Sequence, residues 1–408
     1  MTRTNEPKRS EGKAEEPEFT SIEICAGAGG QALGLHQAGF GHLALVEIDQ
    51  YAAKTLQANV ESHPEWAWER KNCDVLPPTD VNDFSTEKHL RKSVEQLRRR
   101  GLDLLAGGVP CPPFSHAGKQ LGKADERDLF PAMLDLIQEL NPRAVMIENV
   151  RGIMDPKFED YRDWIKARLQ SGWYRGDDGQ RVWEDGLGYK VCEWGILEAS
   201  DFGVPQLRPR AILVAFRSDV LKDVKYEWPA GTHDDHVSVA EALETSMHAR
   251  FKPYLEGARA EQARAAYELW LRNARMRHQV LLEKGSSGIA PTLVGGSKKH
   301  GGADLGPSRA KAAWKQLGIN ALGVANDPET CRQKGTEDRD LFGPNGPMLT
   351  VQQAAIIQGF PPEWQFAGGK TAQYRQVGNA FPPPVAKAVG ESIADVLRAA
   401  RERDGEKA

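Results

Sequence analysis

The sequence predicts an α/β protein built on a mixed, mostly parallel sheet with helices on both faces. Apolar runs typical of buried strands alternate with helical segments from residue 19 onward. Residues 129–140 carry apolar side chains at spacings of three and four, which predicts a helix with one buried stripe. Strands that alternate with helices favour parallel pairing, because each helix crosses a face of the sheet between two strands.

The expected elements begin with a strand at residues 20–25, a glycine turn at 26–30 and a helix at 31–38. We expect the other strands at residues 43–47, 102–106, 144–148, 189–192 and 211–216, and the other helices at 51–59, 129–140 and 385–398. Residues 241–283 are charged and helical in pattern, whereas residues 285–347 are rich in glycine, lysine and proline and have little periodicity. So long a stretch predicts a separate small module, not a loop. Residues 1–18 are polar and predict a disordered tail.

Composition excludes several classes of protein. The chain of 408 residues has a formal net charge of −4, so binding to nucleic acid would need a local basic patch. Its five cysteines are scattered without a CxxC pair, which predicts neither a disulfide framework nor a metal site and fits the reducing cytoplasm. No apolar run is long enough to span a bilayer, so we expect no membrane partner.

The glycine turn Ala26-Gly27-Ala28-Gly29-Gly30 follows a strand and opens a helix, where free backbone N–H groups can approach a ligand. Glu47 ends the next strand, 20 residues after Gly27, and could accept hydrogen bonds from two ribose hydroxyls. Together they predict a nucleoside cofactor. A tight structural turn and a dinucleotide site remain alternatives. Asp74 could accept from an adenine amine or cap a helix.

Cys111 lies on a proline-rich loop after the strand at 102–106 and is a candidate nucleophile, with a packing cysteine as the alternative. Glu148 ends the run at 144–147, and parallel strand ends share one rim. A thiol and an acid together suit covalent attack on a heteroaromatic ring, although a solvated carboxylate is the simpler interpretation of Glu148 alone. Arg208 and Arg210 alternate along an extended segment and suit phosphates or a base carbonyl, unless they are surface charges.

These segments resemble the DNA (cytosine-5) methyltransferases of the bacterial modification type, in the family's usual order and over nearly the whole chain. The matching segments are residues 23–30, 46–49, 72–75, 107–119, 125–130, 148–150, 201–210, 349–366 and 374–383. The resemblance implies the Rossmann-like fold of S-adenosylmethionine-dependent methyltransferases, with an inserted small target-recognition domain. It implies a catalytic domain at 19–245, completed by 346–408, and a recognition domain at 246–345.

The resemblance also implies roles for individual residues. Cys111 would attack cytosine C6, Glu148 would contact the ring N3 and exocyclic amine, and Arg210 the base carbonyl, with Arg208 supporting. Glu47 would hold the ribose of S-adenosylmethionine and Asp74 its adenine amine. The implied cofactor set is Cys25, Ala26, Gly27, Ala28, Gly29, Gly30, Glu47, Ile48, Asp74, Val75, Pro110, Leu129 and Asn379. Cys25 departs from the family, which usually has a phenylalanine against the adenine.

Double-stranded DNA is the implied substrate. Residues 297–315 hold five lysines and arginines against one aspartate, a local basic patch. We expect Ser115, Lys298, Lys299, Arg309 and Lys311 to contact DNA. The resemblance implies a nucleoid-associated monomer and, where one exists, a separately encoded restriction endonuclease with the same site.

An RNA methylase on the same core and a catalytically silent DNA-binding protein are the alternatives. The large basic insert argues against the first. The intact Pro110-Cys111 and the run from Glu148 to Val150 argue against the second.

Overall fold

The computed structural model describes residues 16–110, 128–176, 178–232, 236–282, 288–295 and 303–405. One large sheet contains β1 (Phe19–Ile24), β2 (Phe40–Val46), β3 (Asp74–Val75), β4 (Leu104–Gly108), β5 (Ala144–Val150), β8 (Tyr189–Glu198) and β9 (Pro209–Arg217). Its order is β3-β2-β1-β4-β5-β9-β8. The pairs among β1 to β5 are parallel, and β9 runs antiparallel to both of its neighbours. The predicted mixed, mostly parallel sheet is therefore confirmed.

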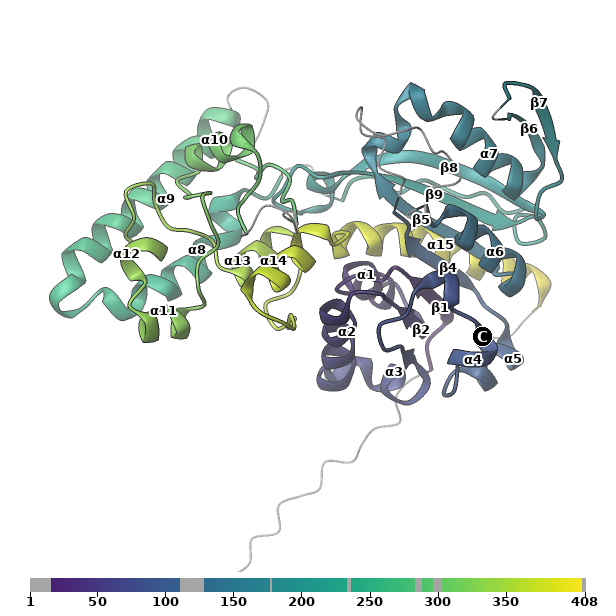
Figure 1. The fold of residues 1–408 in the computed structure, drawn as a ribbon, viewed down its shortest axis with the longest axis horizontal. Helices are drawn as coiled ribbons and strands as arrows, with labels where there is room; N and C mark the ends of the chain where they lie inside the picture. The colour runs from purple at the N-terminus through teal and green to yellow at the C-terminus, as the bar shows by residue number, and fades with distance from the viewer. Residues whose placement is uncertain are drawn as a thin grey trace, which may run out of the picture.

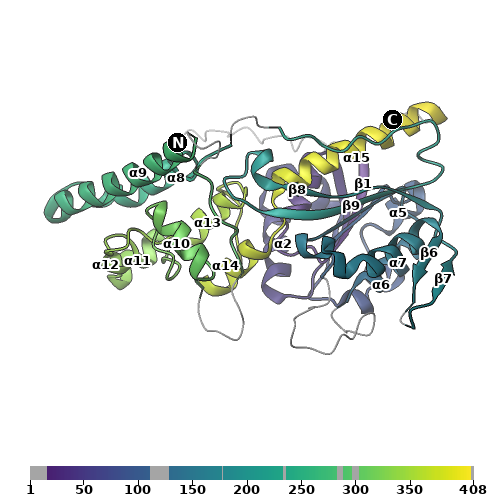
Figure 2. The same ribbon diagram turned by 90° about the horizontal axis from the view of Figure 1, so that it is seen from above.

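Helices cover both faces of this sheet (Figures 1 and 2). Residues of α1 (Gly30–Gln37) and α15 (Pro383–Asp404) share one buried apolar cluster with β1 and β4. Residues of α6 (Phe130–Leu140) and α7 (Glu159–Gln170) share a second cluster on the other face. Because both faces are covered, β1 and β2 are buried along their whole length, including the polar residues Thr20, Ser21 and Glu23 of β1.

The segment after β9 forms a helical lobe that lies beside the sheet (Figure 1). Its helices are α8 (Val239–Phe251), α9 (Ala260–Leu282), α10 (Ser308–Gln316), α11 (Pro328–Lys334) and α12 (Glu337–Asp340). The chain then returns toward the sheet through α13 (Val351–Ile357) and α14 (Lys370–Asn379). The regular helices between residues 308 and 340 were not expected, because they are short and polar and gain order from burial of Trp314 in the lobe.

The remaining elements are short. They include α2 (Gln50–Ser62), α3 (Ala67–Asn72), α4 (Thr86–His89), α5 (Val94–Arg100) and a separate hairpin of β6 (Gly172–Arg175) and β7 (Arg181–Glu184). Within the described ranges, no helix has the length and apolarity needed to cross a membrane.

The predicted tail needs one correction. Glu18 accepts hydrogen bonds from Arg398 at 2.9 and 2.8 Å, and its carbonyl accepts one from Arg401 at 2.7 Å. The Glu16 side chain and the Pro17 carbonyl accept from Arg99 and Arg100 of α5. Residues 16–18 are therefore held by α5 and by α15 and do not belong to a disordered tail. Residues 1–15 lie outside the described part of the chain.

The helices α1 and α15 approach so closely that glycine is required between them. A Cβ placed on Gly34 would come within 2.5 Å of the Ala386 Cβ, and one on Gly390 within 2.8 Å of the Ala38 Cβ. This contact fixes the C-terminal helix directly behind the glycine turn that begins α1.

We predict that Gly34→Ala lowers the free energy of unfolding by about 1–3 kcal/mol, because overpacking exceeds the gain of about 1 kcal/mol in helix propensity. Thermal unfolding measures the change. The control is Gln37→Ala on the exposed side of the same helix, which should leave the midpoint nearly unchanged. An unchanged midpoint for Gly34→Ala would contradict the close helix contact.

Candidate active site

A cavity of about 680 Å³ lies where the carboxyl ends of β1, β2 and β4 meet α14. Its lining residues are Cys25, Gly27, Ala28, Glu47, Ile48, Asp49, Ala52, Asp80, Val81, Gly108, Pro110, Leu129, Ala372, Arg375, Gln376, Asn379 and Ala380. In α/β folds of this kind, ligands bind outside the carboxyl ends of the strands. The volume is within the range that small-molecule sites occupy.

The carboxylate of Glu47 holds two turns of this cavity in place. One oxygen accepts a hydrogen bond from the Gly27 N–H and the other from the Asp49 N–H, each at 2.7 Å. Burial raises the pKa of Glu47, and these two N–H donors counteract part of the rise. Cys25 and Gly27 both have left-handed backbone angles, with φ of 52° and 56°, so the turn curls back toward Glu47. The glycine turn and Glu47, which were expected to serve one cofactor, are thus in direct contact with each other.

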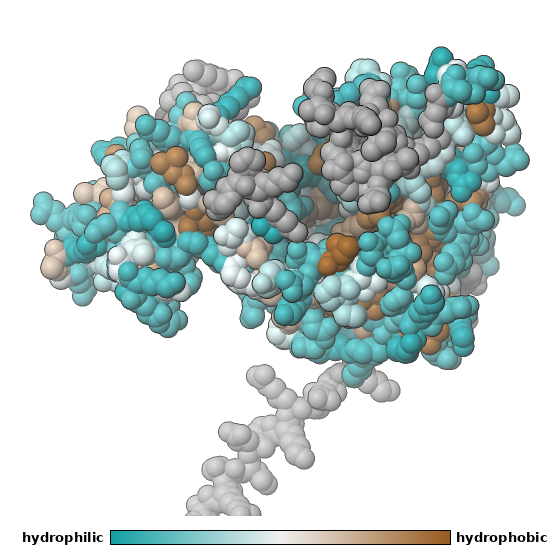
Figure 3. All heavy atoms as spheres, viewed as in Figure 1, coloured by the Kyte–Doolittle hydropathy of each residue, from teal (hydrophilic) through white to brown (hydrophobic). Residues whose placement is uncertain are grey.

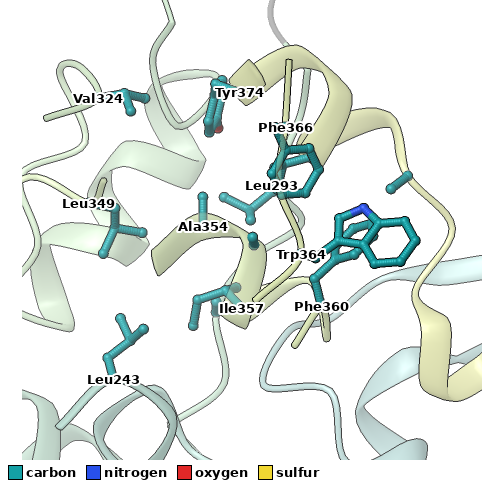
Figure 4. Close-up of a cluster of buried hydrophobic side chains, with 14 of the residues drawn as sticks. Leu243, Leu293, Val324, Leu349, Ala354, Ile357, Phe360, Trp364, Phe366 and Tyr374 are labelled. Atoms are coloured by element: carbon teal, nitrogen blue, oxygen red, sulfur yellow. The ribbon is translucent and has the colours of Figure 1, made fainter. Parts of the chain in front are cut away.

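The C-terminal part of the chain builds the opposite wall of the cavity. The Trp364 indole N–H donates to the Ala28 carbonyl at 3.0 Å, and the Thr55 hydroxyl donates to the Gln376 side chain at 2.6 Å. Figure 4 shows Trp364 beside Phe360 and Phe366 in the apolar cluster behind this wall, with the ring centroids of Phe360 and Phe366 5.2 Å apart. Segments more than 300 residues apart are therefore fixed against one another.

The structure corrects the expectation for Asp74 and Val75. Neither residue lines the cavity. The Asp74 carboxylate accepts from the backbone N–H groups of residues 91–93 and from the Ser93 hydroxyl at 2.8–3.2 Å. It therefore has a structural role in holding the turn before α5, and it is not the local helix cap of the alternative interpretation.

Asp80 and Val81 lie on the cavity instead. The strand register explains the difference. Asp74 pairs with Ala44 in the middle of β2. The Thr79 N–H donates to the Glu47 carbonyl, just beyond β2, so Asp80 lies past the carboxyl end of β2, where the cavity is. The same Asp-Val dipeptide occurs at both places, and only the strand register distinguishes them.

A second acidic group lies on the rim of the sheet. The Glu148 carboxylate accepts from the Arg210 Nε at 2.7 Å, and both side chains are largely buried. Burial raises the pKa of the Glu148 carboxyl, and the attraction of Arg210 and Arg208 offsets only part of that rise. Glu148 pairs with Gly108 at the end of β4. The Glu148–Arg210 pair therefore lies beside the loop that carries Pro110.

The Asn149 side chain fixes that loop, because its amide donates to the Val109 carbonyl at 2.7 Å. Pro110 lines the cavity, and Cys111 is the next residue. Cys111 and Ser115 themselves lie outside the described residues.

Arg208 is a positioning residue, which corrects its prediction as a catalytic one. It is buried, and its two terminal nitrogens donate to the carbonyls of Leu293, Gly378 and Ala380 at 2.7–2.9 Å. These carbonyls belong to the segment between α9 and α10 and to the end of α14 beside Asn379. Arg208 thus joins three segments of backbone and is not aimed at a substrate.

The candidate DNA contacts are only partly described. Lys298 and Lys299 lie outside the described residues. Arg309 is exposed on α10, whereas the Lys311 ammonium forms an ion pair with Asp304 at 2.7 Å. Figure 3 shows a hollow between the helical lobe and the body that contains the sheet. Across the described ranges, no group of three or more metal-ligating side chains is close enough to hold a metal ion.

The sequence missed several residues of the cavity. Asp49 caps α2 with bonds to the N–H groups of Tyr51 and Ala52, a role that its place before a helix could have indicated. Arg375 and Gln376 also line the cavity; they lie in the matching segment 374–383, of which only Asn379 was assigned to the cofactor. Their placement depends on the return of the chain from the helical lobe.

The sheet order and the cavity at its carboxyl end are those of an S-adenosylmethionine-dependent methyltransferase. The family model of C-5 cytosine-specific DNA methylases matches residues 19–395, so the chain belongs to this family. It is a DNA (cytosine-5) methyltransferase, its substrate is DNA and its cofactor is S-adenosylmethionine.

The chain is similar to curated relatives over most of its length. It is 45% identical over 386 residues to the Type II methyltransferase M.NaeI of Lentzea aerocolonigenes, covering 94% of this chain and 76% of that one. It is 40% identical over 384 residues to M.NgoMIV of Neisseria gonorrhoeae, covering 93% and 99%. Among solved structures, the S. pombe Dnmt2 methyltransferase shares the fold with a TM-score of 0.51 and 16% identity, covering 94% of this chain and 99% of that one.

We predict that Asp80→Ala raises the Kd for S-adenosylmethionine about tenfold, because a charge-assisted hydrogen bond is lost. Asp74→Ala should instead lower the free energy of unfolding by about 1–3 kcal/mol, because buried N–H groups lose their acceptor. Calorimetric titration and thermal unfolding of both variants separate the two roles. Weaker cofactor binding in Asp74→Ala alone would instead assign the adenine contact to Asp74.

Proposed function

We propose that this enzyme methylates C5 of a cytosine swung out of a specific duplex DNA sequence, through a transient bond between Cys111 and C6. The observation that carries the proposal is the path of the chain after β4. This segment lines the cofactor cavity at Gly108 and Pro110, and Gly108 pairs with Glu148 of the Glu148–Arg210 pair. Cys111 is the next residue in the sequence after Pro110.

The residues on this rim suit each step of that reaction. Cytosine C5 is a poor nucleophile, and addition of the Cys111 thiolate to C6 moves electron density toward C5. Glu148, whose pKa is raised by burial, can hold a proton for the ring N3 as charge develops there. Arg210, oriented by Glu148, can donate to the base carbonyl. C5 would then take up the methyl group as its bond to the sulfonium sulfur breaks. Loss of the C5 proton to a base, return of the N3 proton to Glu148 and expulsion of the Cys111 thiolate would restore the aromatic ring.

The lining of the cavity suits S-adenosylmethionine, which when bound supplies an electrophilic methyl group. In this proposal Glu47 accepts from the ribose hydroxyls and Asp80 from the adenine amine. Ile48, Val81 and Leu129 supply apolar contacts to the base. The turn at residues 26–30, with Pro110 and Asn379, holds the methionine end. Cys25 lines the same cavity with a smaller side chain than the phenylalanine usual in the family.

We assign DNA recognition to residues 246–345, which make up most of the helical lobe, and catalysis to residues 19–245 with 346–408. The target atom is stacked inside duplex DNA, so the base must leave the helix to reach the rim. Ser115, Lys298, Lys299, Arg309 and Lys311 are the proposed DNA contacts. Two of these residues, Arg309 and Lys311, lie in the described part of the chain. Arg309 is exposed, whereas Lys311 is paired with Asp304, so the charge of Arg309 is the more accessible of the two.

The relatives named Type II methyltransferases support a role in a restriction-modification system. The enzyme would act as a monomer on the DNA of its own cell, in the cytoplasm at the nucleoid. There it would protect the recognition site from a separately encoded endonuclease.

A mechanism-based trap tests the covalent step. Duplex DNA that carries 5-fluorocytosine at the target site should form a stable adduct with the enzyme, because fluorine cannot leave as a proton. Intact-protein mass spectrometry should then show one added DNA strand. Cys111→Ala should form no adduct and lose methyl transfer, while its Kd for S-adenosylmethionine stays within about twofold of the parent. Turnover by Cys111→Ala would contradict the mechanism.

A further inference from the structure

Arg375 is the one basic side chain among the described residues that line the cofactor cavity. It lies on α14, and the three acidic side chains of the lining, Glu47, Asp49 and Asp80, come from the strand and loop side. The proposed steps of the reaction involve Cys111, Glu148 and Arg210 but not Arg375.

The acidic residues of the cavity are already engaged with backbone. Glu47 accepts from the N–H groups of Gly27 and Asp49, and Asp49 accepts from those of Tyr51 and Ala52. Asp80 accepts from the Asn82 N–H at 2.9 Å. No ion pair joins Arg375 to any described residue, and its buried Nε has no hydrogen-bond partner there. A buried donor of this kind is costly unless a ligand satisfies it.

The helix that carries Arg375 is firmly held. The adjacent Gln376 accepts from Thr55 at 2.6 Å and donates to the Ala367 carbonyl at 2.8 Å. Asn379 follows four residues later on the same face of α14 and also lines the cavity. The helical part of this wall is thus positioned without a ligand.

S-adenosylmethionine carries one negative group, the carboxylate of its methionine part. In a cavity lined by three other carboxylates, that group needs a strong donor, and an arginine fork matches carboxylate geometry. We propose that Arg375 binds the methionine carboxylate of the cofactor. This inference rests on S-adenosylmethionine as the cofactor but not on the covalent mechanism. It makes Arg375 a binding residue that orients the sulfonium end of the cofactor.

The test compares two ligands that differ only in the carboxylate. Calorimetric titration without DNA measures the Kd of S-adenosylmethionine and of its decarboxylated analogue for the parent enzyme and Arg375→Gln. We expect the parent to prefer the carboxylate form. Arg375→Gln should weaken that form about tenfold to a hundredfold and change the Kd of the analogue less than threefold.

The matched control is Lys387→Gln, which removes one positive charge from the exposed side of α15, outside the cavity. It should change neither Kd. Thermal unfolding shows that each variant is folded.

Equal weakening of both ligands by Arg375→Gln, or no weakening of either, would overturn the proposal. Loss of DNA binding with unchanged cofactor binding would also overturn it and assign Arg375 to a phosphate of the substrate. Failure of the parent to bind S-adenosylmethionine at all would instead refute the cofactor assignment itself.

Discussion

The organisation of this enzyme depends on one buried cation. The Arg208 guanidinium joins the carbonyl of Leu293, in the segment between α9 and α10, to those of Gly378 and Ala380 on either side of Asn379. Gln206, two residues earlier, adds bonds to the Leu293 N–H at 2.6 Å and to Gln358 at 2.8 Å. The Arg208 Nε has no partner among the described residues, so the buried charge depends on the bonds of its two terminal nitrogens to these carbonyls, which hold the segments in one arrangement.

That arrangement makes the cofactor cavity from both ends of the chain. The N-terminal half supplies the glycine turn, Glu47 and Asp80, whereas α14 supplies Arg375 and Asn379. The close contact of α1 with α15 at Gly34 and Gly390, together with the Trp364–Ala28 hydrogen bond, also holds the C-terminal segment against the N-terminal half. The strand that ends in Gly108 pairs with β5 at Glu148 and leads to Pro110 on the wall of this cavity. The cofactor cavity and the Glu148–Arg210 pair therefore lie at the same edge of the sheet.

Local patterns were sufficient where local physics decides the structure. The continuous apolar runs of β1, β2 and β5 and the stripe of α6 predicted those elements, and the Gly27–Glu47 relation followed from their order. Long-range geometry decides the rest.

The Asp-Val dipeptide occurs at residues 74 and 80, and only the register of the two-residue strand β3 shows which one reaches the cavity. The alternation of side chains along an extended segment predicted that Arg208 and Arg210 share one face. It could not predict that Arg208 donates its hydrogen bonds to backbone carbonyls of distant segments. The helices α10 and α11 were missed because their order comes from packing in the lobe. The role of Cys111 remains a prediction from the motif.

The central claim is that one cofactor molecule binds both ends of the chain at once. Hydrogen–deuterium exchange of the enzyme with and without S-adenosylmethionine tests it most directly. The account predicts slower exchange in residues 26–30 and 47–52 and, at the same cofactor concentration, in residues 372–380. Protection confined to the N-terminal segments, with exchange in α14 unchanged, would contradict it.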